Sequence, residues 1–141
     1  MMLIEVQRSL RNRFDEFRLA AQRENATAAE IALDDFEKHF RRWTEAEEES
    51  LIPALLRANI PGRDVKRELR LEYVQIRELT RFVLQQIRER IRLGNLSGYI
   101  ENLDRRLSAH EREMARVYYP AAENTLTEEE RKSLETAAPP L

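Results

Sequence analysis

A seam of apolar residues in segment 102–120, NLDRRLSAHEREMARVYYP, constrains the fold of this chain more than any other feature. Apolar residues recur there at spacings of four and three, which predicts one buried face of an α-helix. Segment 36–56, FEKHFRRWTEAEEESLIPALL, repeats the pattern. The earlier seam includes one acidic residue, Glu47, and the later seam includes one histidine, His110. We therefore expect two long helices that turn a carboxyl and an imidazole toward a common interior.

Composition favours a single all-α domain. The chain has 141 residues, 35% of them charged, and only 3 glycines, a balance typical of amphipathic helices rather than sheets. A net charge of -2 provides no basic field for nucleic acid, and the absence of cysteine excludes disulfides and thiolate chemistry. Because apolar runs are too short for a membrane span and charge begins early in the sequence, we expect a cytoplasmic protein without a membrane partner.

Breaker and capping residues divide the chain into four long helices and a short fifth one. Two capping boxes, Thr27 with Glu30 and Thr127 with Glu130, mark helix starts. Pro53 should disturb the second helix without ending it. The expected helices cover residues 3–25, 28–58, 65–93 and 98–120, with the short one starting at 127. Short connections favour an antiparallel up-down-up-down four-helix bundle, followed by the short C-terminal helix and a loose tail.

The two seam segments end in similar sequence motifs, EEESLIPAL and AHEREMARVYYPAAE. Both resemble motifs of the hemerythrin-like, or HHE cation-binding, family, and the resemblance extends from RNRFDEF to VYYPAAE. It implies a hemerythrin-like four-helix bundle over residues 1–123, while the capping box and the tail composition predict a short helix with a flexible tail over 124–141. In that family the bundle holds two non-haem irons through histidines and bridging carboxylates, and it binds oxygen, senses it, or handles iron and peroxide.

Most ligand positions implied by this resemblance carry other residues. Glu47 and His110 keep the expected carboxylate and imidazole. The replaced positions are Phe14, Trp43 and Tyr73 for three histidines, and Met114 or Ala115 for the acid after His110. A di-iron site needs several imidazole and carboxylate donors, because each ion must replace most of its hydration shell. We therefore expect no metal and no cofactor, and a core filled by aromatic side chains instead.

Glu47 and His110 allow several arrangements in such a core. The simplest is a mutual hydrogen bond, since either charge alone would be costly to bury. An alternative is a single-metal site for iron or another divalent ion, with Tyr73 as a third donor. A third possibility is a cavity for a small apolar ligand near Trp43 and Met114.

The sequence indicates a regulatory or protein-interaction module rather than an enzyme. It contains no glycine-rich phosphate loop, no Ser, His and Asp pattern in a suitable context, and no Glu-x-x-His on a seam. The alternative is a metal-binding or oxygen- or iron-responsive hemerythrin-like protein with a reorganised site on His110 and Glu47. We expect an unidentified protein partner or a homo-oligomer, because Phe82, Leu84 and Leu93 fall off the seam of the third helix.

Overall fold

The computed structural model describes residues 3–140, which form helices and turns with no strand among them. This confirms the predicted all-α class. The elements in chain order are α1 (Leu3–Gln22), α2 (Ala26–Ala46), the π-helical segment η1 (Glu47–Leu51), α3 (Ile52–Ala58), α4 (Val65–Arg88), the 3₁₀ segment η2 (Leu93–Leu96), α5 (Ser97–Glu113), the π-helical segment η3 (Met114–Tyr118), α6 (Tyr119–Glu123) and α7 (Glu128–Ala137). The outer ends of the predicted ranges 1–123 and 124–141 lie outside the described residues.

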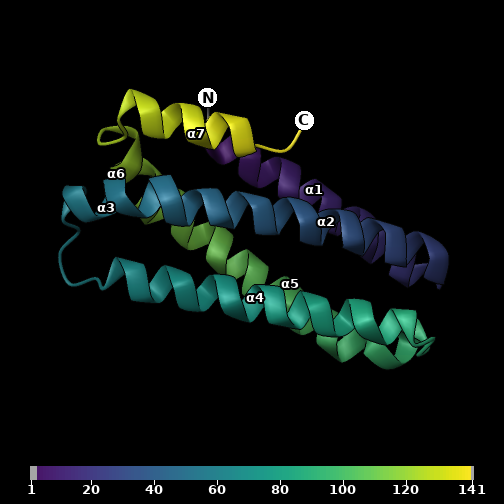
Figure 1. The fold of residues 1–141 in the computed structure, drawn as a ribbon. Helices are drawn as coiled ribbons and strands as arrows, with labels where there is room; N and C mark the ends of the chain where they lie inside the picture. Colours follow the sequence, from purple (N-terminus) through teal and green to yellow (C-terminus); the bar gives the residue numbers. More distant parts are fainter. Residues whose placement is uncertain (1–2, 141) are drawn as a thin grey trace.

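The long helices α1, α2, α4 and α5 lie alongside one another, and successive ones run in opposite directions (Figure 1). α1 packs on α2, α2 on α4, and α4 on α5. α7 packs against α2 and η1, on the side of the molecule away from α4. None of the helices within residues 3–140 combines the length and apolar character needed to cross a membrane.

The predicted seams are buried. The fully buried side chains of largest volume include Trp43, Tyr73, Tyr118, Phe14, Phe17 and Phe36. Aromatic rings of α1 and α2 touch edge to face, with the Phe14 and Phe36 centroids 5.3 Å apart. Burying each such side chain stabilises the fold by about 2 kcal/mol, so these rings contribute substantially to the apolar core.

The second helix begins two residues before the predicted start. Asn25, rather than Thr27, is the N-cap of α2, and its side chain accepts a hydrogen bond from the Ala28 N–H at 3.1 Å. The predicted capping box of Thr27 with Glu30 is therefore wrong. Both residues are acceptable caps, and the turn from α1 decides which of them has the extended backbone a cap requires.

α4 ends five residues before the predicted end of the third helix at residue 93. Its last residue is Arg88, and Arg90 adopts the left-handed conformation with φ of 66°. The Ile91 N–H donates to the Gln86 carbonyl and the Arg90 N–H to the Ile87 carbonyl, which forms a Schellman cap without glycine. The helix stops early because the chain then turns into η2, whose leucines are buried.

Two of the three residues expected to expose apolar surface on the third helix do not. Leu84 and Leu93 are buried, and only Phe82 is exposed. Ile91 lies within the range predicted for the third helix, but it follows the end of α4 and is exposed.

The C-terminal segment is tied to the rest of the molecule. The capping box of Thr127 and Glu130 forms as predicted at the start of α7, and Leu134 is buried in the core. Beyond α7, the Pro140 carbonyl accepts hydrogen bonds from the Ser9 hydroxyl at 3.0 Å and from Arg13 at 2.9 Å. The tail therefore packs on α1 as far as Pro140, which differs from the expected loose tail.

Candidate functional site

Two π-helical turns position the seam residues at the ends of α2 and α5. η1 begins at Glu47 and η3 at Met114, and each ends two residues before a proline, Pro53 or Pro120. The residue before each proline donates its N–H to the carbonyl five residues back. Proline has no N–H to continue an α-helical ladder, so the wide turn sits where that ladder is interrupted. The predicted disturbance of the second helix at Pro53 is therefore the π-helical turn η1.

The wide turn in η3 changes which residues face the core. The sequence pattern predicts that Val117 follows Met114 on the buried seam. Val117 is only half-buried, whereas Tyr118 and Tyr119 are buried. One inserted residue rotates all later side chains by about 100°, which turns Tyr119 toward Glu47.

Glu47 lies in the interior with one oxygen satisfied. Its side chain is 1% exposed, and the Tyr119 hydroxyl donates to its Oε2 atom at 3.0 Å. The other oxygen, Oε1, has no hydrogen-bond partner within residues 3–140. The Tyr73 hydroxyl and the Trp43 indole N–H lie close enough to Glu47 to oppose the rise in its pKa. Neither of them makes a well-formed hydrogen bond. The result is a polar cluster drawn from α2, η1, α4 and α6.

Burial dominates the electrostatics of this cluster. Desolvation raises the pKa of Glu47 from 4.5 to about 7, against the opposing effects of the His110 charge and the Tyr119 hydrogen bond. Burial also raises the pKa of Tyr73 and of Tyr119 well above the usual value, and the nearby Glu47 carboxylate adds to the effect. Near neutral pH Glu47 is therefore divided between its two forms, while both phenols keep their protons.

His110 forms its hydrogen bond with Glu72 instead of Glu47. The Nδ1 atom of His110 lies 2.7 Å from Oε1 of Glu72, on α4. The imidazole is 7% exposed and packs edge to face on the rings of Phe40 and Tyr73. The predicted mutual hydrogen bond between Glu47 and His110 is therefore wrong.

Desolvation explains this choice of partner. The Glu72 side chain is 31% exposed, so it keeps much of its hydration while it accepts a hydrogen bond from the imidazole. Glu47 is fully buried, and a charged pair formed there would lose the hydration of both groups. Glu72 precedes the seam residue Tyr73 by one position on α4, a rotation of about 100° around the helix, so hydrophobic periodicity did not identify it.

The pair of His110 and Glu72 borders a surface hollow between α4 and α5. The hollow has a volume of about 360 Å³, and Arg63 and Glu113 form an ion pair beside it. The Glu72 carboxylate that accepts from Nδ1 fixes the orientation of the imidazole. Glu47 and Tyr119 form a separate, deeper pair.

The residues present do not fit a pair of iron ions. Phe14, Trp43, Tyr73 and Met114 are all buried at the positions where the resemblance implies further ligands. Within residues 3–140, no three His, Asp or Glu side chains converge in a way that could hold a metal ion. In the predicted alternative site of Glu47, His110 and Tyr73, the carboxyl of Glu47 is instead hydrogen-bonded to Tyr119, and the imidazole of His110 to Glu72.

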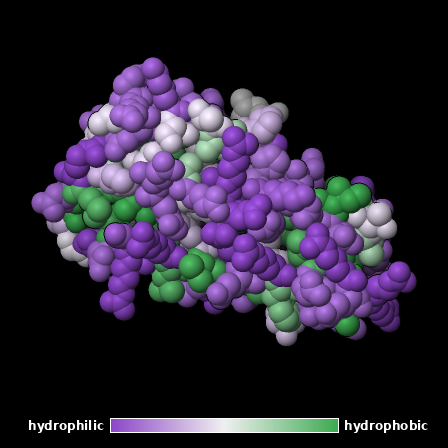
Figure 2. Space-filling model, in the orientation of Figure 1, coloured by the Kyte–Doolittle hydropathy of each residue, from purple (hydrophilic) through white to green (hydrophobic). Residues whose placement is uncertain are grey.

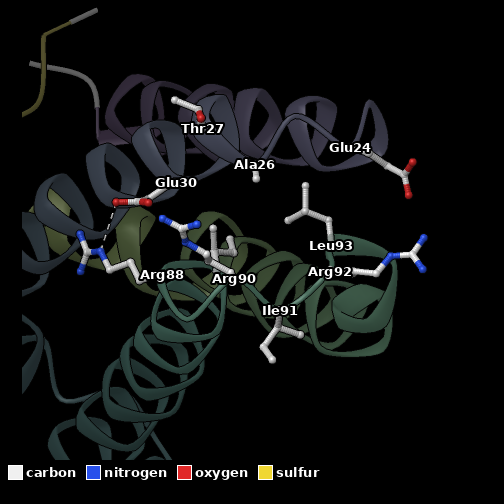
Figure 3. Close-up of a pocket in the computed structure, with 10 residues that line it drawn as sticks. Glu24, Ala26, Thr27, Glu30, Arg88, Arg90, Ile91, Arg92 and Leu93 are labelled. Atoms are coloured by element: carbon white, nitrogen blue, oxygen red, sulfur yellow. Dashed lines mark hydrogen bonds and ion pairs between the residues drawn. The ribbon is translucent and has the colours of Figure 1, made fainter.

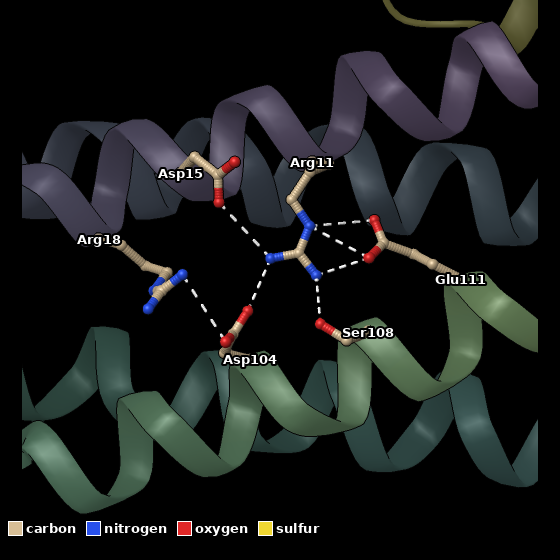
Figure 4. A network of polar contacts seen from close by, with 6 residues as sticks. All are labelled: Arg11, Asp15, Arg18, Asp104, Ser108 and Glu111. Carbon is tan, nitrogen blue, oxygen red and sulfur yellow. Dashed lines mark hydrogen bonds and ion pairs between the residues drawn. The ribbon is translucent and has the colours of Figure 1, made fainter.

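A network around Arg11 fixes α5 against α1 (Figure 4). Arg11 donates to Asp104 at 2.7 Å, to Ser108 at 2.9 Å and to Glu111 at 2.5 Å. Partial burial alone would lower the pKa of Arg11, but the hydrogen bonds to Glu111 and Asp104 raise it overall. Because Glu111 directly follows His110, this network sets the rotation of α5 that places the imidazole.

Another hollow, of about 640 Å³, lies at the end of the long helices away from α3 (Figure 1 and Figure 3). The turn between α1 and α2 and the segment after α4 form its walls, with Arg88, Arg90 and Arg92 on one side. Arg88 is already paired with Glu30, at 3.4 Å. The expected cavity near Trp43 and Met114 is a different place, and there both side chains are buried in the packed core.

Comparison of the chain with protein-family models, with curated proteins and with solved structures finds no match in any of the three.

Proposed function

We propose that this chain is a hemerythrin-like four-helix bundle that has lost its di-iron site and acts as a non-enzymatic regulatory or protein-interaction module. The observation that carries the proposal is the identity of the side chains that fill the bundle interior. Four positions where the resemblance implies metal ligands hold the buried side chains of Phe14, Trp43, Tyr73 and Met114. These side chains stabilise the interior through apolar burial, so the fold does not depend on an ion.

The two residual ligand positions also support a metal-independent interior. Glu47 receives a hydrogen bond from Tyr119, and its pKa of about 7 allows it to be neutral without any cation. His110 is held by Glu72 on the side of α4. Each group therefore has a protein partner that offsets part of its burial cost.

A role in protein contact agrees with the arrangement of the helices. The Arg11 network and the packing of α7 hold the long helices in fixed positions, which suits a scaffold that presents a constant surface. The proposal therefore places function on the outside of the bundle rather than in its interior.

Unfolding experiments test metal independence. We expect the same melting temperature in buffer alone, with excess chelator, and with added ferrous iron. A variant with Glu47→Gln and His110→Gln should keep this independence and remain folded. Glu45→Gln, an exposed change on the same helix, is the matched control. A melting temperature that falls with chelator in the wild type, but not in the double variant, would contradict the proposal in favour of an iron-responsive site on His110 and Glu47.

A further inference from the structure

The chain itself contains an example of a helix docked on the long helices. α7 is acidic in its first turn, with Glu128, Glu129 and Glu130, and it buries one apolar residue, Leu134. Arg57 of α3 forms an ion pair with Glu130. α7 is thus held by one apolar anchor and by arginine contacts with its acidic end.

The outer face of α4 has no such cover. α7 packs on α2 and η1, while α4 lies at the opposite edge of the molecule (Figure 1). Leu71 and Val74, one turn apart on α4, are 54% and 47% exposed. Farther along the same helix, Phe82 is exposed and packs on the exposed ring of Tyr99, with centroids 4.9 Å apart. Hydrophobic surface is visible along this lower edge (Figure 2).

Positive charge flanks the apolar pair. Lys66, Arg67 and Arg70 line the same shallow hollow as Leu71 and Val74, which has a volume of about 510 Å³. Lys66 and Arg67 form no ion pair within residues 3–140, and Arg70 approaches Glu48 only at 3.8 Å. Asp64, the one acidic residue of the hollow, is the N-cap of α4.

We propose that these five residues, Lys66, Arg67, Arg70, Leu71 and Val74, form a docking patch for an acidic amphipathic helix of a partner protein. This inference rests on the proposed role in protein contact and specifies the partner's chemistry. Apolar side chains of the partner helix, spaced three or four apart, cover Leu71 and Val74. Carboxylates beside them pair with the three cations, as Glu130 of α7 pairs with Arg57.

The Phe82 and Tyr99 ring pair extends this surface. Leu71 and Phe82 are eleven residues apart and lie on the same side of α4, a separation of about 17 Å along the axis. A partner helix of three turns that begins at the docking patch therefore reaches the ring pair. Exposed aromatic side chains are common anchors in protein interfaces.

The test uses a synthetic helical peptide with leucine at every third or fourth position and glutamate at most others. Its binding to the isotope-labelled full chain is followed by NMR. We expect saturable binding, with chemical-shift changes centred on residues 64–75. Arg67→Glu combined with Arg70→Glu should raise the Kd at least about tenfold, and so should Leu71→Ser, because one acts on charge and the other on apolar contact.

Two controls separate specific docking from general attraction. Ile31→Ser changes a side chain that is 66% exposed on α2, outside the docking patch, and should leave the Kd unchanged. A peptide with serine in place of leucine keeps the charge and should bind at least about tenfold more weakly. Each variant is first checked for native helix content and cooperative unfolding.

Several results would overturn the docking patch. One is equal affinity of the wild type and the Arg67→Glu, Arg70→Glu variant for the peptide. Another is binding to vesicles containing phosphatidylserine without binding to the peptide, which indicates a lipid surface instead. A third is a dimer that Leu71→Ser abolishes, again without peptide binding, which indicates a second copy of the chain. None of these results affects the chelator experiment, so the two proposals fail separately.

Discussion

Replacing Glu47 by glutamine should stabilise the protein at alkaline pH and have little effect at acidic pH. Glutamine has nearly the same shape and stays neutral, and its carbonyl oxygen can still accept the Tyr119 hydrogen bond. It therefore imitates the protonated form of Glu47 at every pH.

The expected size follows from the pKa of Glu47. Burial raises it from 4.5 to about 7. The folded state therefore binds more protons than the unfolded state between these values, and stability must fall as pH rises. The contribution of protonated Glu47 is fully present below pH 4.5 and is lost as pH passes through about 7. At about 1.4 kcal/mol per unit of pKa, the wild type loses about 3 kcal/mol relative to Glu47→Gln.

Urea unfolding of both proteins at pH 5 and pH 9 measures this difference directly. Because the comparison is between two proteins at each pH, the titration of other groups largely cancels. Glu45→Gln, on the exposed side of the same helix, should track the wild type at both values. The reasoning would be refuted if Glu47→Gln and the wild type differed by the same amount at pH 5 and pH 9, or if the variant lost stability as pH rose.

Three further substitutions test other parts of the structure. Tyr119→Phe removes the only hydrogen bond to the Glu47 carboxyl group within residues 3–140. It should cost about 1 to 3 kcal/mol at pH 9, and less at pH 5, in the same urea assay. Arg11→Gln breaks the hydrogen bonds between α1 and α5 and should lower the free energy of unfolding by about 1 kcal/mol or more. The loss should be smaller in high salt, because salt screens the charges. An equal loss in high salt would indicate that packing, rather than charge, is responsible. Leu134→Ala removes the buried apolar side chain that anchors α7 and should lower the free energy of unfolding by about 2 to 4 kcal/mol. Amide hydrogen exchange should then become faster in α7 than in α4. An equal increase in exchange rate in both helices would contradict local detachment of α7.

Hydrophobic periodicity predicted much of the interior of this molecule correctly. The seam positions of Trp43, Glu47, His110 and Met114 are all buried, because helical spacing alone determines which side chains share a face. The same reasoning failed after Met114. A π-helical turn inserts one residue, and no periodic pattern contains the information that Tyr119 rather than Val117 faces Glu47.

The hydrogen-bond partners in the site could not be predicted from spacing. Glu72 lies at the rim between α4 and α5, where partial hydration makes it a better partner for His110 than the fully buried Glu47. That preference depends on the relative solvent exposure of two carboxylates on different elements. Sequence patterns locate residues on a face, but they do not measure how deep each side chain lies once the helices pack.

Helix ends depended on tertiary context in the same way. Gly94 is a common type of helix terminator, yet α4 ends at Arg88 because η2 must bury its leucines. The capping box of Thr127 and Glu130 was predicted correctly, since both of its hydrogen bonds are local and no other segment competes with them.

Elemental analysis of the protein, purified from iron-supplemented cells without added metal or chelator, tests the central claim most directly. If aromatic side chains and Met114 have replaced the ligands of a di-iron centre, the protein should contain far less than one iron per chain. Its absorption should also show no band beyond that of its tryptophan and tyrosine. Two irons per chain, together with a near-ultraviolet charge-transfer band, would contradict a metal-independent core.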